Sequence, residues 1–210
     1  MPRNAPHTVA GSLWSVSFER RLHAVRQLQT VGLTRLHWDV TDGVFAPEGG
    51  FGPAEALALA EATGTSAEAH LMVTDARATV DAWTELCDTV VVHAESNNWR
   101  AAVRRIESRG VVATVALSPG TPASVAGDLP VLCMSVKPGH GGSPFDHTAL
   151  NKIAQLSESH PGRPVGVDGG VTRAIAREAF AAGATWVVVG TDLFGDGGAE
   201  RWADGLSDGG

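Results

Sequence analysis

The sequence predicts an α/β protein folded as a single closed (β/α)8 barrel, and three observations lead to this prediction. Eight short β-rich runs alternate with helical stretches along the 210 residues, without an internal linker or low-complexity segment. The runs at 89–92 and 187–189 are almost entirely apolar, which is typical of parallel strands covered by helices. Histidines and carboxylates occur where several runs end, and in such barrels the C-terminal strand ends form the active site. An open doubly wound sheet has the same alternation, but eight near-equal units without a boundary favour the barrel.

Apolar alternation or a continuous apolar run marks each predicted strand. The second strand shows this most clearly, because Leu36, Trp38 and Val40 alternate with His37 and Asp39. A strand with this pattern points its apolar side chains to one face and the histidine and carboxylate to the other. The predicted strands are residues 9–14, 35–40, 66–71, 89–94, 111–117, 131–136, 164–168 and 185–190.

Capping residues or a proline mark the starts of most predicted helices, namely Ser17, Pro53, Asp75, Asn97 or Asn98, Asp146 and Thr172. Gly32, Gly110 and Gly183 fall where helices are expected to stop. The predicted helices are residues 17–30, 53–62, 76–86, 99–109, 123–125, 147–159 and 173–182. We expect one barrel domain over residues 1–210, in which residues 195–210 form a short last helix, about 199–206, with frayed ends.

Composition and charge exclude several classes of partner. The chain is 43% hydrophobic and 19% charged, and its formal net charge is −7, which argues against a nucleic acid or an anionic membrane surface. A phosphorylated substrate remains compatible, because a few backbone amides can bind phosphate inside an acidic protein. No signal peptide or membrane-length apolar run is evident, so we expect a cytoplasmic protein. Cys87 and Cys133 are expected to be buried, reduced thiols.

The residues His37, Asp39, His70 and Asp168 end three of the predicted strands and suggest a metal site. Each alone has an ordinary structural explanation, such as a hydrogen-bonded core histidine or a turn aspartate. Four together at strand ends supply a two-histidine, two-carboxylate donor set. That set suits one divalent ion such as zinc, iron(II), manganese or cobalt.

Glycine-rich loops follow the last three predicted strands and suggest a phosphate site. Such loops allow backbone N–H groups to approach an anion closely, although tight turns alone would also explain them. The residues concerned are Gly139, His140, Gly141, Gly142, Gly169, Gly170, Gly190 and Thr191.

Asp39 and Asp168 come from strands on opposite sides of the predicted barrel mouth. A carboxylate on each side of a bound substrate can remove a proton from one face of a carbon acid and return one to the other. A chelated dication stabilises the enediolate that forms between these steps. We expect one of the two carboxyl groups to be ionised and the other protonated, and the pair to titrate as a unit. The alternative is that both are metal ligands with no role in proton transfer.

Four further residues lie near these strand ends. Met72 and Met134 are either core residues or an apolar lid over the reacting carbon. His93 and Glu95 share the inward face at the end of the fourth predicted strand. We expect them to form a structural hydrogen-bonded pair, or to support a metal ligand by hydrogen bonding to it.

The motifs together resemble those of the ribulose-phosphate 3-epimerases, in the same order and over residues 8 to 194. They are Ser12–Ser15, His37–Pro47, His70–Val73, His93–Glu95, Met134–Gly142, Val167–Val171 and Val189–Thr191. The resemblance implies a ribulose-phosphate-binding (β/α)8 barrel that interconverts D-ribulose 5-phosphate and D-xylulose 5-phosphate, and a homo-oligomer. It also implies His37, Asp39, His70 and Asp168 as metal ligands, with Asp39 and Asp168 as the catalytic pair. The substrate-binding residues it implies are Ser12, His70, Met72, Met134, Gly139, His140, Gly141, Gly142, Asp168, Gly169, Gly170, Gly190 and Thr191.

This chain departs from the family pattern around the expected sugar site, but at none of the implied metal ligands. The family usually has Met, Leu, Asn, Phe and Gln where this chain has Thr41, Trp14, Lys137, His140 and Ser143. The alternatives are therefore a 3-epimerase for a ketohexose 6-phosphate or a ketotetrose phosphate. A phosphate-binding barrel lyase or decarboxylase would instead place a catalytic lysine among the inward strand residues. A non-enzymatic sugar-phosphate-binding protein is the remaining alternative.

Overall fold

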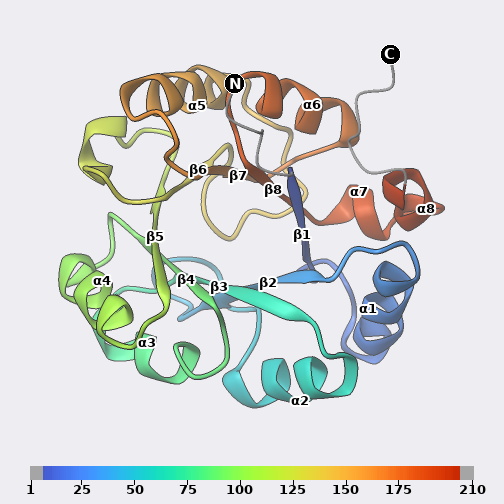
Figure 1. Ribbon diagram of the computed structural model, residues 1–210. Helices are drawn as coiled ribbons and strands as arrows, with labels where there is room; N and C mark the ends of the chain where they lie inside the picture. The colour runs from blue at the N-terminus through green and yellow to red at the C-terminus, as the bar shows by residue number, and fades with distance from the viewer. Residues whose placement is uncertain (1–6, 204–210) are drawn as a thin grey trace.

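A computed structural model describes residues 7–203 and confirms the predicted barrel. Eight parallel strands pair in chain order, and β8 pairs with β1 to close the ring (Figure 1). The strands are β1 (Thr8–Ser12), β2 (Arg35–Thr41), β3 (Ser66–Met72), β4 (Thr89–His93), β5 (Val112–Leu117), β6 (Val131–Met134), β7 (Val165–Asp168) and β8 (Trp186–Val189).

The helices form an outer layer around this ring, as Figure 1 shows. The α-helices are α1 (Arg21–Thr30), α2 (Pro53–Thr63), α3 (Ala76–Trp83), α4 (Trp99–Ser108), α5 (Thr148–Ser159), α6 (Arg173–Ala181), α7 (Thr191–Phe194) and α8 (Gly198–Ala203). Two short 3-10 helices, η1 (Phe18–Arg20) and η2 (Ala123–Ala126), complete the set within the described residues. None of the helices in residues 7–203 has the length and hydropathy of a bilayer span.

Some predicted boundaries were wrong, and local hydrogen bonding explains two of them. The first strand ends at Ser12, so Trp14 lies in a turn in which Val16 N–H donates to the carbonyl of Leu13. The helix expected from Ser17 begins as η1, and the Ser17 side chain makes no capping bond. The caps at Asp75 and Thr172 are confirmed, because each side chain accepts a backbone N–H in the first turn. The predicted tail beyond residue 203 lies outside the described residues.

Two apolar layers hold the barrel together. One lies between the sheet and the helices and joins Val187 and Val189 of β8 to helix residues such as Leu28 and Ile106. The other consists of strand residues alone and fills the barrel interior: Ala10, Val91, Ala116, Leu132, Met134, Trp186 and Val188. Alternate residues of β8 divide between the two layers, as expected of a strand covered on both faces. Cys87 and Cys133 are buried, free thiols, as predicted.

Trp186 plugs the barrel interior and requires a glycine on the neighbouring strand. Gly166 of β7 is its register partner, and a Cβ atom at Gly166 would lie 2.1 Å from the indole Cε2 atom. Both residues belong to closely packed, paired strands, so neither can move away without distorting the hydrogen bonds between the strands. The glycine in β7 is therefore explained by steric fit.

Gly166→Ala is expected to lower the free energy of unfolding by about 3 kcal/mol or more, because the added methyl group overpacks the interior. Urea denaturation monitored by circular dichroism measures this. Gly120→Ala is the matched control, since a Cβ there has open space, and a change within about 0.5 kcal/mol is expected. Combining Gly166→Ala with Trp186→Leu should cost less than the sum of the two changes. Additive costs would show that the indole contact is not the cause.

Candidate active site

Strand register brings the four predicted metal-site residues to the C-terminal end of the barrel. Asp39 of β2 and His70 of β3 are register partners. Asp168, the last residue of β7, pairs with Met134 of β6. His37 lies two residues before Asp39 on the same strand, and its side chain points to the same side because side chains alternate along a strand.

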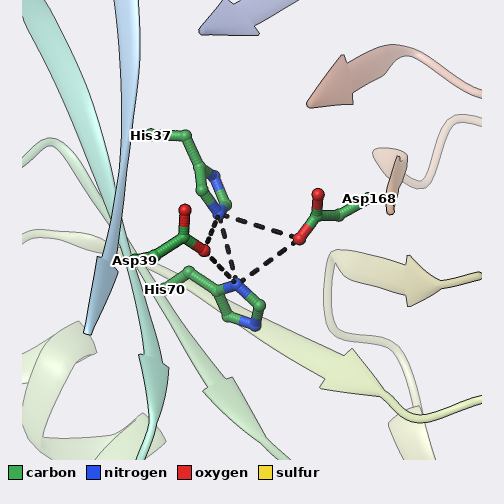
Figure 2. A group of neighbouring side chains, drawn as sticks. All are labelled: His37, Asp39, His70 and Asp168. Carbon is green, nitrogen blue, oxygen red and sulfur yellow. Dashed lines mark hydrogen bonds and ion pairs between the residues drawn. The ribbon is translucent and has the colours of Figure 1, made fainter. Parts of the chain in front are cut away.

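The side chains of these residues meet around one point (Figure 2). One potential ligand atom from each of His37, Asp39, His70 and Asp168 lies within 4.8 Å of all the others. Nε2 of His37 is 3.4 Å from Oδ1 of Asp39 and 3.2 Å from Nδ1 of His70. Oδ2 of Asp168 is 3.7 Å from the same His70 nitrogen, and Figure 2 shows it approaching from the side opposite Asp39.

The donor set fits a divalent metal ion. Two imidazole nitrogens and two carboxylate oxygens are ligands that zinc and other first-row divalent ions accept. Nδ1 of His37 lies 2.7 Å from Oε1 of Glu68, and Arg35 also hydrogen-bonds Glu68. Nε2 of His37 is therefore left to face the cluster. Histidines that bind a metal usually make such a hydrogen bond to a carboxylate with their other ring nitrogen. The residues present could therefore hold one divalent cation.

The cluster is buried, and its charges perturb one another strongly. Burial opposes a charge on His37, but the Asp39 and Glu68 carboxylates outweigh it and raise the His37 pKa well above its usual value. Burial likewise opposes ionisation of Asp39, but His37 outweighs it and holds the Asp39 pKa below its usual range. Burial raises the pKa of Asp168, and the charge of Asp39 raises it further, although His37 opposes this. The two pKa values are thus shifted in opposite directions, and of the two carboxyl groups Asp168 holds a proton more readily.

Ser12, the last residue of β1, orients Asp39. Its hydroxyl group donates a 2.6 Å hydrogen bond to Oδ2 of Asp39, and both residues are buried. The hydroxyl oxygen also accepts the backbone N–H of Trp14 at 3.3 Å. The other oxygen of Asp39, Oδ1, remains directed at the two histidines.

A cavity of about 470 Å³ opens beside the cluster. That volume lies within the range of small-molecule sites. His70 is fully buried and is not among the lining residues, although we expected it to contact substrate. The predicted residues that do line the cavity are Ser12, Asp39, Met72, Met134, Gly139, His140, Gly141, Gly142, Asp168, Gly169, Gly170, Gly190 and Thr191.

Some of the loop glycines are required by contacts between loops. Gly170 has a φ of +60°, and a Cβ atom there would lie 2.6 Å from the backbone nitrogen of Phe145. A Cβ atom at Gly141 would lie 2.8 Å from Cδ1 of Trp14. By contrast, Gly142 has open space around its Cβ position. Close packing of the β6 loop against the β7 and β1 loops thus explains part of the glycine content.

The positions that depart from the family pattern divide between cavity and surface. Trp14, His140 and Ser143 line the cavity. Thr41 is absent from the lining, and its hydroxyl group donates to the carbonyl of Gly49 at 2.9 Å. Lys137 is exposed and is likewise absent from the lining. Of these five positions, Trp14, His140 and Ser143 are therefore the ones placed to contact a ligand.

Arg201 of α8 also lines the cavity, and sequence reasoning missed it. Its guanidinium group donates to the backbone carbonyls of Asp192 and Asp196, which hold it against the segment that follows β8. The residue lies in a glycine-rich tail without a recognised motif, so the sequence carried no signal for it.

Comparisons with known proteins agree on one family. The family model described as the ribulose-phosphate 3 epimerase family matches residues 8–194. The chloroplastic ribulose-5-phosphate-3-epimerase of Arabidopsis thaliana is 35% identical over 201 residues, covering 89% of this chain and 71% of that protein. The ribulose-phosphate 3-epimerase of Bacillus subtilis is 32% identical over 199 residues, covering 89% of this chain and 92% of that protein.

Solved structures of lower identity share the barrel fold. A 3-hexulose-6-phosphate synthase has a TM-score of 0.69 and 16% identity, covering 95% of this chain and 97% of the other. The phosphoribosyl anthranilate isomerase of Thermus thermophilus has a TM-score of 0.67 and 17% identity, covering 93% of this chain and 94% of the other. At this identity the likeness concerns the fold alone.

Proposed function

The chain belongs to the ribulose-phosphate 3-epimerase family, and from this premise we propose that it interconverts D-ribulose 5-phosphate and D-xylulose 5-phosphate. One observation carries the proposal. Asp39 and Asp168 reach the same cluster from different strands and line the same cavity. This arrangement supports an acid–base role for each residue, one on either side of a sugar carbon bound between them.

The two carboxyl groups perform the proton transfers. One carboxylate removes the C3 proton and leaves an enediolate, and the other carboxyl group delivers its proton to the opposite face of C3. Inversion leaves the ionisation states of the two residues exchanged. The pKa shifts support this, since that of Asp39 is lowered and that of Asp168 is raised. Ser12 keeps Asp39 oriented during the transfer.

We assign His37, Asp39, His70 and Asp168 as the residues that hold a single divalent cation: zinc, iron(II), manganese or cobalt. Such an ion, when bound, would act as a Lewis acid that stabilises negative charge on the oxygens of the substrate. Burial of the two histidines keeps water away from their ring nitrogens. Binding of the cation would displace protons held between His37 and the carboxylates.

The phosphate group of the substrate is assigned to the end of the cavity lined by the β7 and β8 loops. Gly170, Gly190 and Thr191 offer backbone N–H groups there, and Arg201 adds a positive charge. Met72, Met134 and Val136 give the cavity apolar walls near the carboxylates. These walls exclude water from the enediolate.

Proton NMR of D-ribulose 5-phosphate in heavy water tests the proposal. The metal-loaded protein is expected to exchange the C3 proton for deuterium and to produce xylulose 5-phosphate. Exchange without net product would contradict the action of a second acid. No exchange would contradict the substrate, and a ketohexose 6-phosphate and a ketotetrose phosphate would be tested next.

Another ketose phosphate is the second candidate, because Trp14 lines the cavity where the family usually has leucine. A lyase or decarboxylase is less consistent with this site: among the described residues that line the cavity, none is a lysine.

The same proposal includes the setting in which the protein works. We assign residues 1–210 to one catalytic domain that acts in the cytoplasm as a homo-oligomer, without nucleic-acid or membrane partners. A rice relative named as a cytoplasmic isoform supports that location, although the Arabidopsis relative is chloroplastic. The net charge of −7 supports the absence of nucleic-acid partners.

A further inference from the structure

Two side chains outside the four-residue cluster continue a chain of hydrogen bonds that begins at His70. His93 ends β4 and is fully buried, and its Nε2 atom lies 2.9 Å from Nε2 of His70. The Nδ1 atom of His93 lies 3.0 Å from Oε2 of Glu95. The chain therefore runs from the cluster through two imidazole rings to a carboxylate.

Glu95 is anchored by the loop that follows β5. Its Oε1 atom accepts the backbone N–H of Ser118 at 3.1 Å and the hydroxyl group of Thr121. Oε1 is thus used by the loop, and Oε2 by His93. The carboxylate acts as an acceptor in every one of these bonds.

The direction of these bonds determines which nitrogen of His70 carries hydrogen. An ionised carboxylate only accepts, so His93 carries its hydrogen on Nδ1. Complete burial disfavours a second proton on the ring, so Nε2 of His93 accepts the hydrogen on Nε2 of His70. His70 is left with a lone pair on Nδ1, the atom 3.5 Å from Asp39 and 3.7 Å from Asp168.

His37 shows the same arrangement with a single carboxylate in place of the two-residue chain. Glu68 lies 2.7 Å from Nδ1 of His37, and Nε2 faces the cluster. Each histidine thus turns inward the nitrogen that its outer partners leave free. The two rings reach the cluster from different places (Figure 2), because His70 is level with Asp39 in the strand register whereas His37 lies two residues earlier on β2.

We propose that Glu95 and His93 are positioning residues: they hold His70 in the tautomer whose Nδ1 lone pair faces Asp39 and Asp168, and so strengthen divalent-cation binding. The inference rests on the proposed function only in requiring that the cluster binds a cation. Outer partners of this kind contribute roughly 10–100-fold to metal affinity.

Glu95→Gln separates this role from loop packing. If the glutamine oxygen accepts from Ser118 and Thr121, its NH2 group faces Nδ1 of His93 and donates to it. His93 then donates from Nε2 to His70, which forces the His70 hydrogen onto Nδ1. The loop bonds survive in this variant while the tautomer of His70 is reversed. Thr121→Val is the matched control, because it removes one bond from the loop side of Glu95 and leaves Oε2 on His93.

Two measurements test the proposal. Nitrogen-15 shifts of the histidine rings in metal-free protein are expected to show His70 protonated on Nε2 in the wild type and on Nδ1 in Glu95→Gln. Cobalt(II) titration against a competing chelator should show an affinity weaker by about 10-fold or more for Glu95→Gln. The cobalt(II) affinity of Thr121→Val should stay within about 3-fold of the wild-type value. The hydrogen bond that this variant lacks belongs to the loop, and the outer partner of His70 remains in place.

The inference would be overturned by wild-type His70 protonated on Nδ1, by unchanged cobalt affinity in Glu95→Gln, or by an equal loss of cobalt affinity in Thr121→Val. Wild-type protein that binds no cobalt would also overturn it. Protein that binds cobalt and shows these differences but does not epimerise would refute the proposed reaction alone. The tautomer and affinity measurements therefore keep the two proposals apart.

Discussion

Replacing either Asp39 or Asp168 with asparagine is expected to abolish epimerisation, lowering kcat by about 10²–10⁴-fold. An asparagine side chain has nearly the same shape but neither accepts nor delivers a proton at neutral pH. Both side chains line the cavity and belong to the same cluster, so each substitution removes one of the two proposed acid–base groups. The measurement is the initial rate of epimerisation of D-ribulose 5-phosphate at a saturating concentration of divalent metal.

The pair of variants also makes a prediction that a purely ligating role does not. Each variant retains the carboxylate that deprotonates one epimer, so each should exchange the C3 proton of at most one sugar in heavy water. The two variants should then act on opposite epimers. Metal content is measured in both, because asparagine is also a weaker ligand. Near wild-type turnover in either variant, with metal bound, would be incompatible with two-carboxylate catalysis.

Removal of divalent metal is expected to eliminate turnover and to lower thermal stability. Without a cation, an enediolate beside the Asp39 carboxylate would lack the counter-charge of the ion, and so would the two carboxyl groups. A ligand that binds only the folded state stabilises it by about 2.7 kcal/mol at roughly 100 times its Kd. Dialysis against a chelator, followed by activity assay and calorimetry, measures both effects.

Adding metal back to the chelator-treated protein distinguishes loss of the ion from damage to the protein. Manganese, cobalt, zinc and iron(II), added singly, should restore activity and melting temperature to different degrees, which would also identify the preferred ion. The control is His37→Gln, in which one of the proposed ligands is missing; added metal should raise its melting temperature less than that of the wild type. Full activity after exhaustive chelation, with metal content verified as absent, would contradict the assignment of the cluster as a required metal site.

The sequence predicted the barrel and the four-residue cluster for physical reasons that can be named. Alternation in β2 separates Leu36 and Trp38 from His37 and Asp39, and this pattern depends only on strand geometry. Parallel closure then brings Asp168 to the same end as His70, because all C-terminal strand ends lie on one side of a barrel. Both steps rest on periodicity and topology, which are encoded locally.

Other features depend on distances between segments that no local pattern encodes. The Glu68 contact with His37 follows from the register of β2 and β3. Arg201 enters the cavity because α8 folds back against the β8 loop, and its anchoring partners are backbone carbonyls available from any residue type. Trp14 packs against Gly141, which is far away in the sequence. A single sequence gives no signal for such pairings.

The Trp186 plug has a kinetic consequence. Trp186 and its apolar neighbours fill the barrel interior, while His37 and His70 are fully buried. Within the described residues, we therefore expect the cavity lined by Asp39 and Asp168 to be the route by which an ion bound to the cluster enters or leaves. A sugar phosphate seated in that cavity would block the exit, so metal release to a chelator should slow as substrate saturates. Turnover itself would then protect the catalyst from losing its ion.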